Sequence, residues 1–189
     1  MHPFDENHVI GIGRDTKVGD NDRVQQLGVK IALFNVADVS NPKVLDDFVI
    51  GDSSSHSEAQ YNHKAFFFDK SRNVLSIPIS GDSDSLEHIT SKMFASEYNR
   101  WSGFYVFDVS STNGLSIKGT VTHSDSDSRY YGMADARTFY IEDILYTASQ
   151  GHLKMNSFDN LEEINSIKLE NTGKFIDYLE EPMIVEPIR

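Results

Sequence analysis

Short apolar runs separated by polar turns follow one another along most of the chain. The runs are about four to eight residues long, rich in Val, Ile, Phe and Tyr, and bounded by Asp, Asn, Ser, Gly or Pro, which is typical of β-strands. Only residues 86–98 space their apolar positions as a short helix would. The sequence therefore predicts an all-β fold with strands near residues 9–13, 29–34, 44–50, 65–68, 74–79, 104–107, 115–122, 138–141, 145–148, 153–155 and 163–169.

One pattern of strands recurs three times. A strand leads through a tight polar turn to a second strand, a loop follows, and a third strand ends in a short signature before a turn and a fourth strand. The signatures are residues 34–36, 107–109 and 156–158, with Asn35, Asp108 and Ser157 at their centres. Four-stranded repeats that stack face to face predict blades of a β-propeller, because a small sheet cannot bury both faces alone. A β-sandwich would not predict the repeated signature.

The repeats divide the chain into three predicted blades and a tail. Blade 1 comprises residues 1–51, blade 2 residues 52–123 and blade 3 residues 124–170, and residues 171–189 form the C-terminal tail. Three blades are fewer than the four to eight of a closed propeller. We therefore expect a partial propeller, or half of a six-bladed propeller that a homodimer completes.

The connections between strands differ in length on the two faces of such a propeller. The turns between first and second strands and between third and fourth strands, which share one face, are short throughout; we call this the short-turn face. The opposite, long-loop face receives longer connections at residues 15–28, 51–62, 80–102 and 123–135. Because elaborated loops on a rigid scaffold usually carry binding, we expect function on the long-loop face.

Several segments resemble a known family. Residues 8–15, 33–43 and 57–66, continued by 104–109, 137–147 and 161–166, are similar to the β-propeller domain of bacterial and archaeal secreted proteins, which is distantly similar to WD-repeat propellers. The resemblance covers about residues 2–169 and only the C-terminal part of that domain. Asn35 and Ser157 depart from the Asp that the family's signature more typically carries, as Asp108 does. The family is largely uncharacterised, so the resemblance implies a propeller fold and secretion or surface display, and no reaction.

Composition and charge argue against several classes of binding partner and site. The net charge of −12 argues against nucleic acid or an anionic membrane as the main partner, because both require basic patches. The chain has no cysteine, which excludes disulfides, cysteine nucleophiles and thiolate zinc sites. No apolar stretch is long enough to span a membrane. Residues 1–5 lack the regions of a signal peptide, so we expect any export signal upstream.

Acidic residues outnumber basic ones in the predicted long loops, and two chemistries follow from them. Asp82-Ser83-Asp84 and Asp125-Ser126-Asp127 alternate like the start of a calcium loop, so Asp82, Asp84, Asp125 and Asp127 are candidate Ca²⁺ ligands. Neither loop continues with the glycine that a calcium loop requires. The alternative is that they are solvated surface loops.

The remaining candidates form a predicted ligand face. Three histidines on separate loops, His56, His88 and His123, could bind Zn²⁺, but they lack the close spacing of a usual zinc motif. His2 and His63 are better explained by a structural hydrogen bond between blades. No catalytic motif of the Gly-x-Ser-x-Gly or dinucleotide-binding kind is complete. The candidate ligand-face residues are His56, Glu58, His88, Arg100, Trp101, His123 and Arg129.

Two functional hypotheses follow. The first is a non-catalytic extracytoplasmic scaffold that binds a protein or surface glycan through its long-loop face and needs no cofactor. The alternative is a Ca²⁺-dependent hydrolase or lyase that uses the loop carboxylates.

Overall fold

The computed structural model describes residues 1–19, 21–88, 100–124 and 133–169. In these residues the strands form three four-stranded antiparallel sheets, which confirms the predicted all-β fold. The first sheet has the order β1 (His2–Pro3), β2 (His8–Val18), β3 (Val24–Asn35) and β4 (Lys43–Ile50). The second consists of β5 (Phe67–Asp69), β6 (Val74–Asp82), β7 (Arg100–Ser110) and β8 (Gly114–Thr122), and the third of β9 (Arg137–Ile141), β10 (Ile144–Ala148), β11 (His152–Ser157) and β12 (Glu163–Lys168).

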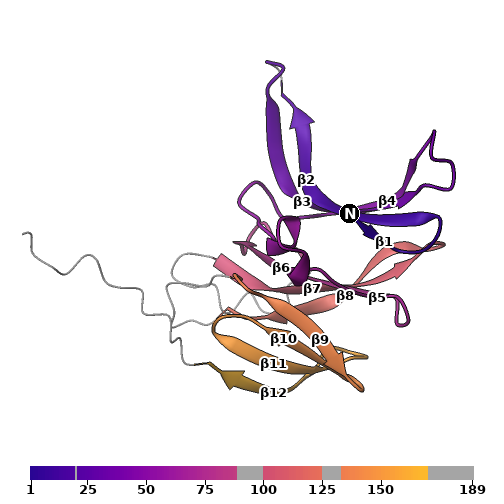
Figure 1. The fold of residues 1–189 in the computed structure, drawn as a ribbon. Coiled ribbons are helices and arrows are strands. Elements are labelled where there is room, and N and C mark those ends of the chain that lie inside the picture. The colour runs from indigo at the N-terminus through magenta and orange to yellow at the C-terminus, as the bar shows by residue number, and fades with distance from the viewer. Residues whose placement is uncertain (20, 89–99, 125–132, 170–189) are drawn as a thin grey trace, which may run out of the picture.

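The sheets stack face to face, with the second sheet between the other two (Figure 1). Ile10 of β2 and Ile31 and Leu33 of β3 are fully buried, and they share one apolar cluster with Leu75 and Phe107 of the second sheet. A smaller cluster joins the second and third sheets and contains Val74, Val106, Leu145 and Phe158. Each pair of neighbouring sheets thus buries the apolar faces that neither sheet could bury alone.

One hydrogen bond recurs in all three sheets and explains the repeated signature. The backbone N–H of Val36 donates to the carbonyl of Asn7 at 2.7 Å, and that of Val109 donates to the carbonyl of Asn73 at 2.8 Å. In the third sheet, the N–H of Phe158 donates to the carbonyl of Asp143 at 2.9 Å. The last residue of each signature therefore ties the end of a third strand to the first turn of its own sheet, and this bond aligns the repeats with one another.

The predicted loop at residues 15–28 is wrong, because most of these residues are strand. Strands β2 and β3 continue as a paired hairpin to Val18 and Val24, past a β-bulge between Arg14 and Thr16. The hairpin projects beyond its sheet (Figure 1). Its outer part is solvent-exposed and mostly polar, apart from the exposed Val18 and Val24, and a mostly polar composition is also what a loop would show.

Two other predictions fall at the edge of the described residues. In the predicted helix at 86–98, residues 86–88 are not helical, and the rest lie outside the described ranges, as does the tail at 171–189. The helical pieces in the described residues are two 3-10 turns, η1 (Glu58–Gln60) and η2 (His63–Ala65), between β4 and β5. Ser57 and Gln60 form a capping box that starts η1, with each side chain satisfying the other's backbone.

Candidate functional site

Acidic side chains on the short-turn face accept hydrogen bonds from residues of their own turns. The Oδ1 atom of Asp5 accepts the N–H of Asn7 at 2.9 Å, and that of Asp69 accepts the N–H of Ser71 at 2.7 Å. Asp38 accepts both the hydroxyl and the N–H of Ser40, and these bonds hold the pKa of Asp38 below its ordinary value. These carboxylates close Asx-turns, which is a structural role.

On the long-loop face, the segment after β4 interlocks with the segment after β6. The N–H of Asp82 donates to the hydroxyl of Ser54 at 3.3 Å, and the Arg14 guanidinium donates to the carbonyls of Ser53 and Ser55. Gly51 lies between them with φ +64°, and a Cβ there would be 2.0 Å from the Ser55 hydroxyl oxygen. Glycine at position 51 therefore allows the two segments to approach.

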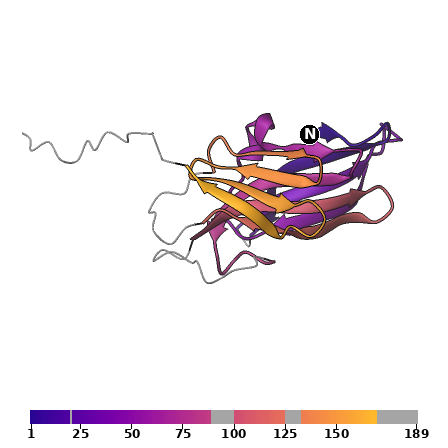
Figure 2. The ribbon, with the colours of Figure 1, turned by 90° about the horizontal axis from the view of Figure 1, so that it is seen from below.

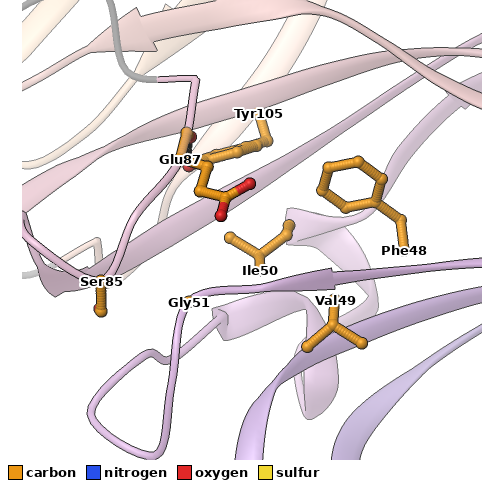
Figure 3. A pocket seen from close by; sticks show the side chains of 7 residues that line it. All are labelled: Phe48, Val49, Ile50, Gly51, Ser85, Glu87 and Tyr105. Carbon is orange, nitrogen blue, oxygen red and sulfur yellow. Dashed lines mark hydrogen bonds between the residues drawn. The ribbon is translucent and has the colours of Figure 1, made fainter.

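A pocket of about 110 Å³ opens beside this contact, between the first two sheets. Phe48 and Ile50 form one wall from β4, and the ring of Tyr105 from β7 faces them (Figure 3). The other lining residues are Val49, Gly51, Ser85 and Glu87. The pocket combines aromatic and aliphatic walls with one carboxylate, which is the composition of a site that takes a ligand with an apolar part and a positive or hydroxyl-bearing part.

The polar groups of the pocket differ in how they are held. The Tyr105 hydroxyl donates to the backbone carbonyl of Glu87, and burial, followed by the Glu87 charge, raises the pKa of Tyr105. The Glu87 side chain is 87% exposed, and its carboxylate points over the pocket mouth toward Ile50 (Figure 3). The backbone at this rim is therefore anchored, while the carboxylate is exposed to solvent with His88 Nε2 3.8 Å from its Oε2.

Two of the predicted ligand-face residues, His88 and Trp101, contact residues that line this pocket, and Arg100 adjoins Trp101 in the sequence. His88 follows Glu87 with φ +65°, and its ring centroid is 6.1 Å from that of Phe48. Trp101 is buried, donates from Nε1 to Thr122 at 3.1 Å, and packs edge-on against Tyr105. Arg100 is exposed at the start of β7, opposite Asp82.

The other predicted ligand-face residues are not gathered there. His56 is exposed and forms a backbone bridge with Ser80. Arg129 lies outside the described residues. His2 and His63 line a second pocket of about 90 Å³, and His2 contacts the ring of Phe66 at 5.1 Å, so its contact between the first two sheets is aromatic.

Glu58 is buried and its carboxylate is occupied by structural partners. Oε2 accepts the backbone N–H of Ala136 at 3.0 Å, and Oε1 accepts from the side-chain amide of Asn62. The Arg137 guanidinium lies 3.8 Å from Oε1. Glu58 thus joins η1 to the beginning of β9, and it holds the third sheet against the connection that precedes the second.

His123 is also buried, between the second and third sheets. Its Nδ1 is 2.8 Å from the Ser149 hydroxyl and its Nε2 is 2.8 Å from the Thr147 hydroxyl. Burial lowers the pKa of His123 to about 3, with further lowering from the positive charges of Lys154 and His152. His123 is therefore neutral at physiological pH and links β10 to the end of β8.

The candidate calcium ligands divide between described and undescribed residues. Asp82 accepts the N–H of Asp84 at 3.0 Å, so this alternation also forms an Asx-turn, like those at Asp38 and Asp69. Asp125 and Asp127 lie outside the described residues. Among the residues with described positions, no group of three or more His, Asp or Glu side chains is arranged to hold a metal ion.

Sequence reasoning missed Phe48, Tyr105 and Glu87 as a set. Glu87 belongs to a long acidic loop that the sequence did indicate. Phe48 and Tyr105 come from strands of different sheets, and their meeting depends on how the sheets stack. No local signal in the sequence marks that contact.

In the described parts of the chain, no helix is long and apolar enough to cross a membrane.

Comparison with known proteins agrees with this architecture. The chain is 24% identical over 170 residues to an uncharacterised protein of Archaeoglobus fulgidus, and 25% identical over 171 residues to an uncharacterised protein of Methanocaldococcus jannaschii. Each alignment covers 90% of this chain, and the chain spans about a fifth of the length of these curated relatives. No solved structure gives a significant match. The profile of the family described as "Beta propeller domain" matches residues 1–161, and the chain therefore belongs to the β-propeller domain family.

Proposed function

We propose that this β-propeller domain is a non-catalytic, extracytoplasmic binding scaffold that takes a protein or a surface glycan on its long-loop face. The pocket between β4 and the 82–88 segment carries the proposal. Its walls, Phe48 and Ile50, are apolar, and Glu87 presents an exposed carboxylate at its mouth. On the short-turn face, by contrast, Asp38 and Asp69 are engaged within their own turns.

Binding, rather than proton transfer, fits the chemistry of this pocket. The phenol of Tyr105 has a raised pKa and donates to the Glu87 carbonyl, so it is a poor general base or acid near neutral pH. The net charge of −12 favours a ligand with basic or hydroxyl-rich groups, because complementary charge speeds encounter and suppresses wrong partners. The extracytoplasmic location rests on the family resemblance alone.

The test uses the labelled full chain on glycan arrays and on arrays of basic and neutral peptides. We expect the wild type to bind a defined subset of glycans or basic peptides, and Glu87→Gln to weaken that binding by about tenfold through loss of one ionic hydrogen bond. Glu87→Arg should abolish it. Glu6→Arg is the matched control, because it makes the same charge change at an exposed position on the short-turn face.

The control decides between a site and general charge. If Glu6→Arg weakens binding as much as Glu87→Arg does, binding depends on the overall charge and the proposed pocket is wrong. If no array ligand distinguishes wild type from Glu87→Arg, the proposal also fails. Unchanged thermal unfolding of both variants shows that the comparison concerns binding and not folding.

A further inference from the structure

The stack of three sheets ends in two broad faces that no described residue of the chain covers. One is the face of the third sheet that points away from the second, and it is nearest the viewer in Figure 2. We call it the blade 3 outer face. The other is the face of the first sheet that points away from the second, the blade 1 outer face. Both faces can be compared, residue by residue, with equivalent faces that are buried inside the stack.

The blade 3 outer face is apolar over most of its area. Thr138 and Tyr140 point toward the second sheet, where Thr138 bonds Ser76 and Tyr140 contacts Phe67, so the alternate residues Phe139 and Ile141 point outward. The Phe139 ring stacks on that of Tyr146 with centroids 4.9 Å apart and planes 3° from parallel. The remaining outward residues, by strand register, are the apolar Ile144, Ala148, Leu153, Met155 and Ile167 and the polar Arg137, Ser157 and Asn165.

The repeat assigns buried counterparts to these residues. The recurring hydrogen bond of the three signatures aligns Met155 with Leu33 and Val106, which are fully buried against the next sheet. By the same alignment Tyr146 stands at the position of Ile10, which is also fully buried. The blade 3 outer face therefore has the composition and register of a face that packs against a following blade.

The blade 1 outer face also has a buried counterpart in the repeat. Val9 and Phe34 pair on it, and Phe34 aligns with Phe107, which is buried against the preceding sheet in the second repeat. The next outward residues of β2 are Gly11 and Gly13. A Cβ at Gly11 would be 2.9 Å from the Phe34 ring and 3.2 Å from the Met1 sulfur, whereas a Cβ at Gly13 would have no atom within 4 Å. The face is therefore covered at Gly11 and open at Gly13.

Charged residues near both faces are partly paired within the chain. On the blade 1 outer face, Lys30 is paired with Asp47 at 2.9 Å and with Asp15 at 3.3 Å. On the third sheet, Arg137 is paired with Glu58 and Asp135. Each group has two carboxylates for one base and so keeps a net negative charge, and contact between the faces should therefore be tighter at higher salt.

From this we infer that a second copy of the chain covers both faces. The blade 3 outer face of each copy packs on the blade 1 outer face of the other about a twofold axis, which closes a ring of six blades. Each copy contributes one face of each kind, so two contacts of this head-to-tail type satisfy both open faces and leave none for further growth.

Sedimentation velocity of the full chain tests this arrangement. We expect one species of about twice the 21.3 kDa of the chain. Ile141→Asp, at a position that is 56% exposed in the single chain, should weaken the dimer on the order of 100-fold, because each of the two contacts would bury a carboxylate without a partner. Gly13→Phe should do the same from the other side, because it places a ring on the open part of the blade 1 outer face.

Two controls have the same chemistry at sites away from the faces. Val39→Asp adds a carboxylate at a residue that is 89% exposed on the short-turn face, and Gly151→Phe adds a ring where a Cβ also meets no atom within 4 Å. Both variants should remain dimers. Mixing Ile141→Asp with Gly13→Phe should restore a weak dimer, because the mixed pair has one contact with both faces intact.

Four results would overturn the inference. These are a monomer at micromolar concentration, an assembly larger than a dimer, dimers of Ile141→Asp as tight as those of the wild type, or no association in the mixture. The last would indicate contact between like faces. Because the array test uses Glu87 on the loops and this test uses the sheet faces, either proposal can fail while the other holds.

Discussion

Replacing His123 should reveal how much a neutral, buried imidazole contributes to stability. The test compares how the free energy of unfolding depends on pH in wild type and variant. His123 is 2% exposed and lies between the Thr147 and Ser149 hydroxyls. The pKa of His123 is lowered from its ordinary 6.5 to about 3, first by burial and then by the positive charges of Lys154 and His152. Between pH 6.5 and about 3, His123 is therefore protonated in the unfolded chain and neutral in the folded chain.

The sign and size of the effect follow from this difference. Below pH 6.5 the unfolded state binds a proton at His123 and the folded state does not, so the free energy of unfolding falls as the pH falls toward 3. The loss is about 1.4 kcal/mol for each pH unit in this window. At pH 4.5 it amounts to roughly 2.5 kcal/mol relative to pH 8.

His123→Gln removes the titrating ring while keeping a donor and an acceptor for the two hydroxyls. At pH 8 we expect the variant to be about 1–2 kcal/mol less stable than wild type, through lost packing against the Phe104 ring at 5.1 Å. At pH 4.5 the order should reverse, because wild type alone carries the roughly 2.5 kcal/mol loss. Carboxylates such as Asp52, whose pKa is lowered chiefly by bonds from Ser54, titrate in both proteins and cancel from the difference.

The assay is urea unfolding at fixed protein concentration, from pH 8 to pH 4.5, followed by the fluorescence of Trp101. This is the chain's one tryptophan, and it is 2% exposed, so its emission reports loss of the core. If the stability difference between wild type and His123→Gln is the same at pH 8 and pH 4.5, His123 is not buried as a neutral group and the reasoning is wrong.

Substitutions at three further positions test the contacts between sheets by the same unfolding assay. Glu58→Ala should cost about 3 kcal/mol and Glu58→Gln about 1 kcal/mol, because the alanine leaves the buried Ala136 N–H unsatisfied; a loss under about 0.5 kcal/mol for alanine would show that Glu58 is not structural. Gly114→Ala should cost about 2 kcal/mol, because φ is +77° and the added Cβ would be 2.0 Å from an Asp46 oxygen, and a neutral result would contradict this geometry. Arg72→Ala should cost about 1–2 kcal/mol, since its guanidinium lies over the Tyr140 and Phe158 rings at 4.5 and 4.3 Å, and Arg72→Lys should recover only part of it if the planar contact matters.

Much of the fold could be predicted because its signals are local. The fourth strands at residues 44–50, 115–122 and 163–169 agree with the observed β4, β8 and β12 to within one residue at each end. The signatures could be recognised because one backbone hydrogen bond imposes the same pattern three times. The projecting hairpin was missed, since pairing between Lys17 and Gln25 leaves no apolar periodicity to detect.

For the candidate site, the sequence predicted the long-loop face but not the residues that form the pocket. Loop lengths indicated the side on which the pocket lies, but Phe48 and Tyr105 meet through sheet stacking, which no spacing encodes. Glu58 was expected at the surface because carboxylates are rarely buried without partners. One partner, the Asn62 amide, is only four residues away in the sequence. The other, the Ala136 N–H, is 78 residues away, and only the fold brings it to Glu58. The Ser57–Gln60 capping box was not predicted either, although its Ser-x-x-Gln pattern is a local signal.

The central claim is that the sheets stack face to face, with the Ser76 side of the second sheet against the Thr138 side of the third. An engineered disulfide between these two positions can test it directly. The hydroxyls of Ser76 on β6 and Thr138 on β9 are buried and 3.0 Å apart, although 62 residues separate them. Because the chain has no cysteine, Ser76→Cys/Thr138→Cys introduces one possible pair. Mild oxidation followed by mass spectrometry should show rapid and complete intramolecular cross-linking, whereas Ser76→Cys/Phe139→Cys, with the second cysteine on the outer face, should stay reduced. Free thiols in the first variant, or equal cross-linking in both, would contradict the stack.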